Sequence, residues 1–193
     1  GVQLVAAGHI HKHQKSLIKD AAVVYPGSRD TIEKYYKTAK EHGFTEENIG
    51  CPIIISNESI DIKTKDLVVQ VCKKLAEADG LLVLSHVKGH SCSGFGGAIK
   101  NLGMGAVSKK TKEDIHENGA PFLNNDKECT GCGLCAKICP GNAITIEKGK
   151  AKINLDSCLG CSSCIIKCPN KALTTKKAFF DDLLVQSAQA VLS

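Results

Sequence analysis

Residues 129–140 read CTGCGLCAKICP, and residues 158–169 read CLGCSSCIIKCP. Each stretch spaces four cysteines as C-x2-C-x2-C-x3-C and places a proline after the last one, and the second stretch follows the first at an offset of 29 residues. Cysteines at this spacing are typical of iron–sulfur ligands and not of disulfide partners. The sequence therefore predicts an internal repeat that holds two metal clusters in a reducing compartment.

The spacing is that of bacterial two-cluster ferredoxins, in which the fourth cysteine of each motif binds the cluster of the other motif. Two [4Fe-4S] clusters are therefore the predicted cofactors. Their expected ligands are Cys129, Cys132, Cys135 and Cys168 for cluster I, and Cys158, Cys161, Cys164 and Cys139 for cluster II. Small residues between the ligands allow backbone N–H groups to approach the sulfurs. Two four-cysteine zinc sites are the alternative, although zinc ribbons favour separated CxxC pairs.

Composition limits the class of protein. The chain has 193 residues and 42% hydrophobic residues, which is enough for one medium and one small domain. No run of 18 apolar residues or secretory pattern is present, so we expect a cytoplasmic protein without a membrane span. The formal charge of +5 falls to about +1 once two clusters with their thiolates, about −4 in total, are counted. Net charge thus gives no support for nucleic-acid binding.

Residues 1–122 are predicted to form an α/β domain with a mostly parallel sheet, because helical and strand patterns alternate there. The patterns predict a helix over Thr31–His42, a strand over Ile53–Ser56, an amphipathic helix over Lys65–Ala78 and a buried strand over Leu81–Ser85. This domain is expected to be incomplete.

The C-terminal part differs in character. Residues 123–176 are predicted to form a small α+β, ferredoxin-like domain around the two clusters. Residues 177–193 read as a helix with an apolar stripe, and we expect this helix to pack back on the α/β domain.

A glycine-rich segment follows the strand pattern at Leu81–Ser85. Ligands of open α/β sheets bind beyond the carboxyl ends of strands, and six glycines between residues 89 and 105 let backbone amides approach an anion. The residues expected to bind a cofactor or anionic ligand here are Lys88, Gly94, Gly96 and Gly97. Tight turns are the alternative use of these glycines, and the segment matches neither a P-loop nor G-x-G-x-x-G.

The chain resembles a known family in YPGSR (25–29), EHGFT (41–45) and LSHVKGH…GFGGAIKNLGMG (84–105), followed by the double cysteine motif. These strings are similar to uncharacterised iron–sulfur-centre proteins whose α/β part is domain of unknown function family 362. The resemblance covers about residues 23–192. Members are usually longer, which implies that the chain is a fragment or a shortened form.

A more distant resemblance concerns one site. The pattern His90-x9-Lys100-x15-His116 is similar to that of nickel-pincer lactate racemases. The resemblance implies that His90 is the catalytic acid/base, Lys100 the catalytic residue that tethers a pyridinium cofactor, and His116 a metal ligand. Ala98-Ile99 and Asn101-Leu102 depart from that family's pattern around the lysine.

Several other residues carry weaker signals. His9, His11 and His13 alternate, so they either share a strand face and bind a metal or are solvated. Cys51 and Cys72 are interpreted as core residues, whereas Cys92 lies next to two histidines in the glycine-rich segment and is a candidate for a functional role.

These patterns favour an electron-transfer protein that relays electrons through two clusters to a ligand or partner at the α/β domain. An oxidoreductase activity is compatible with this hypothesis, with a redox partner protein or a small-molecule acceptor. The alternatives are a racemase-like, metal- or cofactor-dependent enzyme with structural clusters, and a subunit that only delivers electrons to a larger partner.

Overall fold

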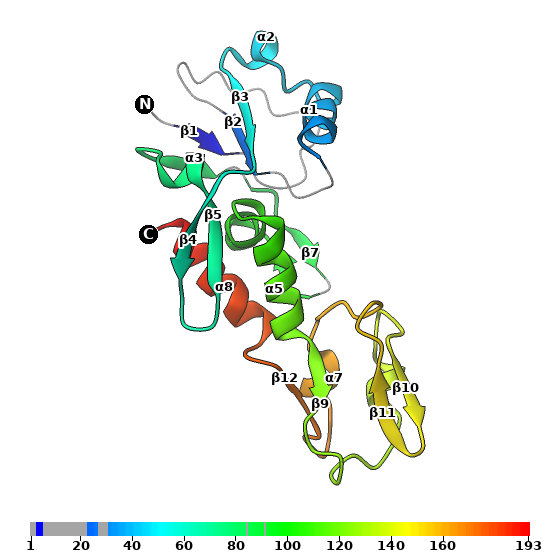
Figure 1. Ribbon diagram of the computed structural model, residues 1–193. Coiled ribbons are helices and arrows are strands. Elements are labelled where there is room, and N and C mark those ends of the chain that lie inside the picture. The colour runs from blue at the N-terminus through cyan, green and yellow to red at the C-terminus, as the bar shows by residue number, and fades with distance from the viewer. Residues whose placement is uncertain (1–2, 6–22, 27–30, 84, 91) are drawn as a thin grey trace. The chain divides into compact units, whose positions relative to one another are not determined.

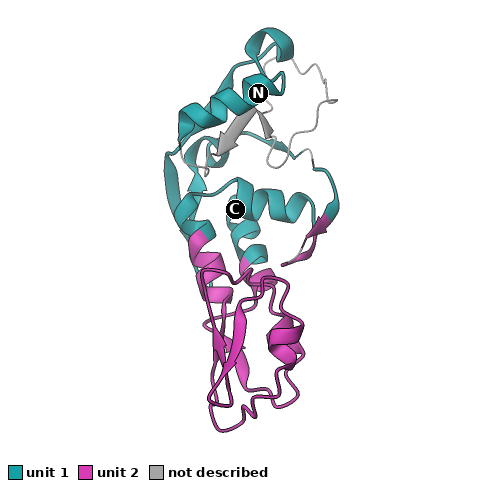
Figure 2. Cartoon of the chain, turned by 90° about the vertical axis from the view of Figure 1, so that its right-hand side faces the viewer, with its two compact units in different colours: residues 1–88, 96–112, 184–193 teal, residues 89–95, 113–183 magenta. Residues whose placement is uncertain are grey.

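The computed structural model describes residues 3–5, 23–26, 31–83, 85–90 and 92–193. The chain divides into two compact units, drawn in teal and magenta in Figure 2. Unit 1 comprises Gly1–Lys88, Gly96–Lys112 and Leu184–Ser193, and unit 2 comprises Gly89–Phe95 and Glu113–Leu183. Each unit is therefore built from separate stretches of the sequence.

Unit 1 contains a four-stranded sheet of short strands. Its order is β3 (Ile53–Ser56), β2 (Val23–Pro26), β1 (Gln3–Val5) and β6 (Leu81–Val83), and each neighbouring pair is parallel. The strand predicted over Ile53–Ser56 is confirmed. A strand is also found at Leu81, but Leu82 is 41% exposed, so the prediction that this strand is buried was wrong.

Helix α1 (Ile32–Glu41) confirms the helix predicted over Thr31–His42. Thr31 has extended backbone angles, and its hydroxyl accepts a hydrogen bond from Lys34 N at 3.4 Å, which is the usual role of an N-cap threonine. On the same helix, the Tyr36 hydroxyl donates to Ile53 O at 3.2 Å and therefore ties α1 to β3. The short helix α2 (Glu46–Ile49) follows.

The prediction of a helix over Lys65–Ala78 was wrong. Strands β4 (Ser59–Lys63) and β5 (Val68–Cys72) form an antiparallel hairpin, and only the four-residue helix α3 (Lys73–Ala76) follows it. Burial alternates along β5: Val69 and Val71 are fully buried, whereas Val68 is 47% exposed. This period of two, in a run of β-branched residues, favours a strand over a helix.

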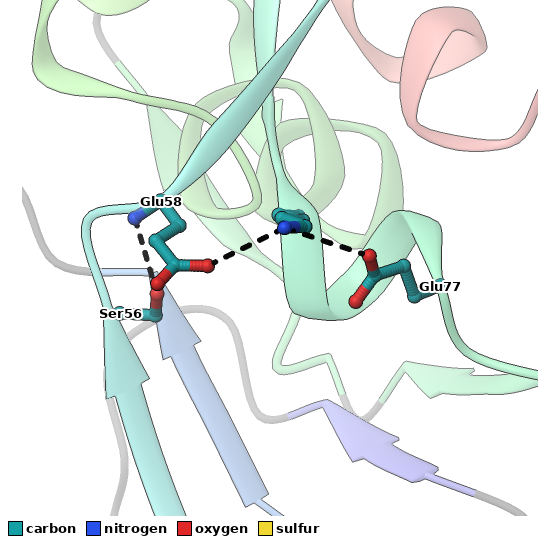
Figure 3. Close-up of polar contacts among 4 residues, drawn as sticks. Ser56, Glu58 and Glu77 are labelled. Carbon is teal, nitrogen blue, oxygen red and sulfur yellow. Dashed lines mark hydrogen bonds and ion pairs between the residues drawn. The ribbon is translucent and has the colours of Figure 1, made fainter.

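Polar contacts link the start of this hairpin to α3. Glu58 N donates to Ser56 Oγ at 3.1 Å, and Lys73 Nζ lies 3.9 Å from a carboxylate oxygen of Glu58 and of Glu77 (Figure 3). The Lys73 backbone N–H also donates to Glu58 O at 2.9 Å. Because these ion pairs are exposed, they fix local geometry more than they add stability.

The glycine-rich segment forms short strands and helices instead of a loop. It forms the two-stranded sheet of β7 (Lys88–His90) and β8 (Gly94–Gly96), then α4 (Ala98–Lys100) and the π-helix η1 (Asn101–Gly105). Helix α5 (Lys109–Gly119) follows. π-helical turns are rare and occur often at functional sites.

The second half of helix α8 (Phe180–Val191) packs within unit 1 against η1. Ser187 Oγ donates to Gly103 O at 2.7 Å, and a Cβ atom added at Gly103 would lie 2.6 Å from Leu184 O. Gly103 is thus needed for close approach of two helices, which is a structural use of one glycine in the segment.

Unit 2 repeats one supersecondary unit at the 29-residue offset of its sequence. In the first copy, β9 (Pro121–Leu123), α6 (Leu134–Lys137) and β10 (Ile144–Glu147) follow one another, and in the second β11 (Lys150–Ile153), α7 (Ser163–Ile166) and β12 (Leu173–Thr175) do so. The antiparallel pairs are β9 with β12 and β10 with β11, so β9 pairs with a strand of the other copy (Figure 1).

Left-handed backbone angles follow the same offset. The matched pairs with positive φ are Gly131 and Gly160, Gly133 and Ser162, and Asn142 and Lys171. The buried core of unit 2 consists of Ile144, Ala151, Cys164 and Leu173.

The structure confirms a mixed α/β chain with a C-terminal helix. Outside the four-stranded sheet, its described sheets are two-stranded, and the pairs β4–β5, β9–β12 and β10–β11 are antiparallel. None of the described helices is long and apolar enough to cross a membrane.

Candidate metal-cluster site

The four cysteines predicted to bind cluster I line one cavity in unit 2. Cys129, Cys132 and Cys135 come from the first motif and Cys168 from the second. The walls of the cavity also include the apolar residues Leu134, Ile146, Ala151 and Leu173. The fold therefore places Cys168 of the second motif in the same cavity as the first three cysteines of the other motif, and their role as cluster ligands stays a prediction.

The second set of cysteines is also gathered in unit 2, and the thiols influence one another electrostatically. Burial raises the pKa of the Cys158 thiol, and Cys139 and Cys161 raise it further. Burial, together with Cys158 and Cys161, raises the pKa of the Cys164 thiol to about 12. Clustered thiols in a dry site resist ionisation, which a bound metal overcomes by stabilising the thiolates.

Backbone N–H groups donate to several of these sulfurs. Ala143 N lies 3.3 Å from Cys139 Sγ, and its counterpart Ala172 N lies 3.4 Å from Cys168 Sγ. Both bonds span four residues and follow a residue with positive φ. Gly160 N donates to Cys158 Sγ at 3.4 Å. Gly160 is one of the small residues between the predicted ligands, whereas Ala143 and Ala172 follow the last cysteine of their motifs.

The cysteines lie in the apolar core of the unit. Cys164 is a core member, and three cysteines from the first motif, Cys129, Cys135 and Cys139, pack against the same core. Both motifs therefore share one hydrophobic interior. Such an environment restricts water around a metal group.

Residues from outside the cysteine motifs cover the second repeat. Cys92 Sγ donates to Leu159 O at 2.6 Å, and the His90 Nδ1 atom lies 3.2 Å from Cys92 N and 3.3 Å from Ser93 N. Cys92 therefore packs on the loop between Cys158 and Cys161. The sequence gives no signal for this contact, because 67 residues separate its partners.

His116 lies beside Gly160 of the second repeat. Its ring packs on that of Phe180 with 5.1 Å between centroids, and its Nδ1 would lie 3.5 Å from a Cβ atom at Gly160. Within the part of the chain that the structure describes, no group of three or more His, Cys, Asp or Glu side chains is placed to hold a metal ion. The metal-ligand role of His116 stays a prediction.

The other predicted site residues lie in the glycine-rich segment. Lys88 is exposed on β7, Gly94 has a φ of 67° at the start of β8, and Gly96 and Gly97 are buried. The Cδ atom of Lys100 would lie 3.5 Å from a Cβ atom at Gly96. His90 belongs to unit 2, whereas Lys100 belongs to unit 1. Their catalytic roles stay predictions.

The other cysteines and histidines with a predicted role are Cys51, Cys72, His9, His11 and His13. Cys51 and Cys72 are buried, in agreement with their interpretation as core residues, and burial raises the pKa of the Cys72 thiol. His9, His11 and His13 lie outside the described residues.

Comparison with known proteins gives a family without an assigned activity. The model of the family "Domain of unknown function (DUF362)" matches residues 12–191. The uncharacterised protein MJ0726 of Methanocaldococcus jannaschii is 55% identical over 31 residues, which are 16% of this chain and 14% of that relative. The match thus spans about a seventh of that relative's length. Because the family model covers most of the sequence, the chain belongs to the DUF362 family.

Proposed function

We propose that the chain is an electron-transfer protein that carries two [4Fe-4S] clusters in unit 2. The observation that carries this proposal is the cavity lined by Cys129, Cys132, Cys135 and Cys168. Three of these cysteines are close in sequence, but Cys168 is 33 residues beyond Cys135. Its presence in the same cavity matches the exchange of fourth ligands in two-cluster ferredoxins.

The surroundings of the cysteines suit such a group. A cubane cluster is bound by thiolates spread around its corners, so its ligands line a cavity and need not converge on one point. Three backbone N–H groups already donate to motif sulfurs, those of Ala143, Gly160 and Ala172. Donors of this kind stabilise the negative charge of a cluster and its thiolates.

Bound clusters would each accept and release one electron. The protein residues have separate tasks. The eight thiolates bind the iron, the loop N–H groups favour the more negative reduced state, and the core around Ile144 and Leu173 limits access of water. The loops are short, so the ligands need little reorganisation when the charge changes.

We propose two kinds of partner for the clusters. Electrons pass to a redox partner protein or to a small-molecule acceptor, and we propose that the segment of residues 86–105 recognises that acceptor. Lys88 and Lys100 would bind an anionic group, and His90 would supply a proton that accompanies the electron.

Metal analysis and spectroscopy of the full chain, purified without oxygen, test the proposal. We expect about eight iron and eight sulfide per chain. Dithionite should bleach the visible absorption and produce the EPR signal of reduced clusters. Stoichiometric zinc without sulfide, or a chain that dithionite does not reduce, would contradict it.

A further inference from the structure

The Ser162 hydroxyl lies inside unit 2 without a hydrogen-bond partner. The residue is only 6% exposed, and among the described residues its Oγ is the one buried side-chain nitrogen or oxygen in this state. Buried polar atoms normally have a partner, because leaving one unpaired is unfavourable. Ser162 stands between Cys161 and Cys164, two of the cysteines proposed to bind cluster II.

The usual reason for a serine before a helix does not apply here. Ser162 precedes α7, but its side chain makes no capping hydrogen bond, and its φ of 57° is left-handed instead of extended. Its backbone carbonyl accepts from Ile165 N at 3.0 Å and Ile166 N at 3.1 Å, so the turn is complete without the hydroxyl. The hydroxyl therefore does not serve the helix.

Glycine suits this backbone position better than serine. The matching residue in the first repeat is Gly133, with a φ of 77°. A non-glycine residue at positive φ carries backbone strain. The second repeat therefore combines two unfavourable features at one position, a strained backbone and an unpaired buried hydroxyl. A cluster sulfur is an acceptor that would satisfy the hydroxyl.

We propose that the Ser162 hydroxyl donates a hydrogen bond to an inorganic sulfide of cluster II and so raises the reduction potential of that cluster. This inference rests on the proposed function. A hydrogen bond to the cluster stabilises the reduced form more than the oxidised form, because the reduced form is more negative. Cluster I receives no such bond at the equivalent position, since Gly133 has no side chain.

The size of the effect follows from hydrogen-bond energetics. A hydrogen bond to a charged acceptor changes an equilibrium about tenfold or more. A tenfold change in the reduction equilibrium of a one-electron couple corresponds to about 59 mV. Because the oxidised cluster also accepts the bond, only the difference between the two redox states shifts the potential, and the Ser162 hydroxyl is expected to hold the potential of one cluster up to about 59 mV above its value without the hydroxyl.

Redox titration of the full chain, followed by EPR without oxygen, tests the inference. Ser162→Ala removes the hydroxyl and keeps the strain, whereas Ser162→Gly removes both and reproduces the residue of the first repeat. Both variants should lower one of the two potentials by up to about 59 mV, a tenfold change in the reduction equilibrium constant, and leave the other potential unchanged. The control is Ser157→Ala, which removes an exposed hydroxyl beside Cys158 and should shift neither potential.

The possible outcomes separate the inference from the proposed function. Wild-type protein without clusters would overturn both. Wild-type protein with two clusters, and unchanged potentials in Ser162→Ala, would overturn only the role of the hydroxyl. A shift in Ser162→Gly but not in Ser162→Ala would also overturn it, because backbone strain would then be the cause. Equal iron and sulfide contents in both variants are required for the expected result.

Discussion

The two repeats of unit 2 have the same backbone pattern and different surroundings. Their helices, strands and left-handed residues match at the 29-residue offset. Burial does not match: Cys132 is exposed and its counterpart Cys161 is half-buried, while Cys135 is half-buried and its counterpart Cys164 is buried. Cys92 and His116 contact the second repeat. A duplicated ligand motif thus sets similar geometry, and residues elsewhere in the chain make the two sites unequal.

The largest expected effect comes from removing one ligand in each repeat. Cys135→Ser and Cys164→Ser should each lower the iron content from about eight to about four per chain, because each removes a ligand of a different cluster. Cys164→Ser should also destabilise unit 2 more, since Cys164 belongs to its buried core. Iron analysis and thermal unfolding without oxygen measure the two effects.

Cys92→Ser is the matched control for these variants. It replaces a cysteine outside the motifs by a residue that retains a donor toward Leu159 O, so the iron content should stay near eight. An equal loss of iron in Cys92→Ser would contradict the assignment of ligands to the motifs alone.

The next effect tests whether the repeats share one core. Ile144→Ala and its counterpart Leu173→Ala should each cost about 2–5 kcal/mol of stability, because both side chains are buried in the same cluster of residues. Ile146→Ala on the same strand as Ile144 removes a 36% exposed side chain and should cost less. Hydrogen exchange of unit 2 measures these costs. A cost of either core variant no larger than that of Ile146→Ala would contradict the shared core.

A smaller effect distinguishes matched glycines. Gly131 and Gly160 both have positive φ, so alanine is strained at either position. A Cβ at Gly131 would lie 2.5 Å from Gly149 O, whereas the nearest atom to a Cβ at Gly160 is His116 Nδ1 at 3.5 Å. Gly131→Ala should therefore cost roughly 1–3 kcal/mol more than Gly160→Ala. Equal thermal unfolding midpoints of the two variants would contradict this difference.

The smallest effect concerns charge at the end of β10. The Lys152 ammonium group donates to Glu147 at 2.9 Å and lowers the pKa of that carboxyl below 4.5. The pair therefore contributes its stability at a pH above about 4.5 and loses it as the pH falls through the lowered pKa. In the second repeat, the counterpart of Glu147 is Lys176, which forms an ion pair with Glu117 at 2.8 Å. NMR titration should show the Glu147 pKa rising in Lys152→Met; no change would exclude Lys152 as a cause.

Local sequence patterns predicted features whose causes are local. Thr31 identifies the start of α1 because its hydroxyl caps that helix, and the apolar run of Ile53–Ser56 identifies β3. The four cysteines that the spacing assigns to cluster I line one cavity, and their role as ligands stays a prediction.

Features that depend on distant contacts were not predictable in this way. Over Lys65–Ala78 the apolar residues fit a helix, but pairing with β4 favours a strand, and pairing partners are not visible in a local window. The contact of Cys92 with Leu159 also joins residues far apart in the sequence. The roles of His90, Lys100 and His116 stay predictions, which mass spectrometry of the Lys100 peptide and nickel analysis test.

The division of the sequence between the units has a consequence for biosynthesis. Residues 184–193 belong to unit 1, yet both cysteine motifs precede them in the chain. During translation, both motifs are therefore synthesised before the last stretch of unit 1. Folding of unit 1 therefore waits for a segment that is made after both motifs, and the clusters proposed for unit 2 would be bound by a chain whose unit 1 is the later of the two to be completed.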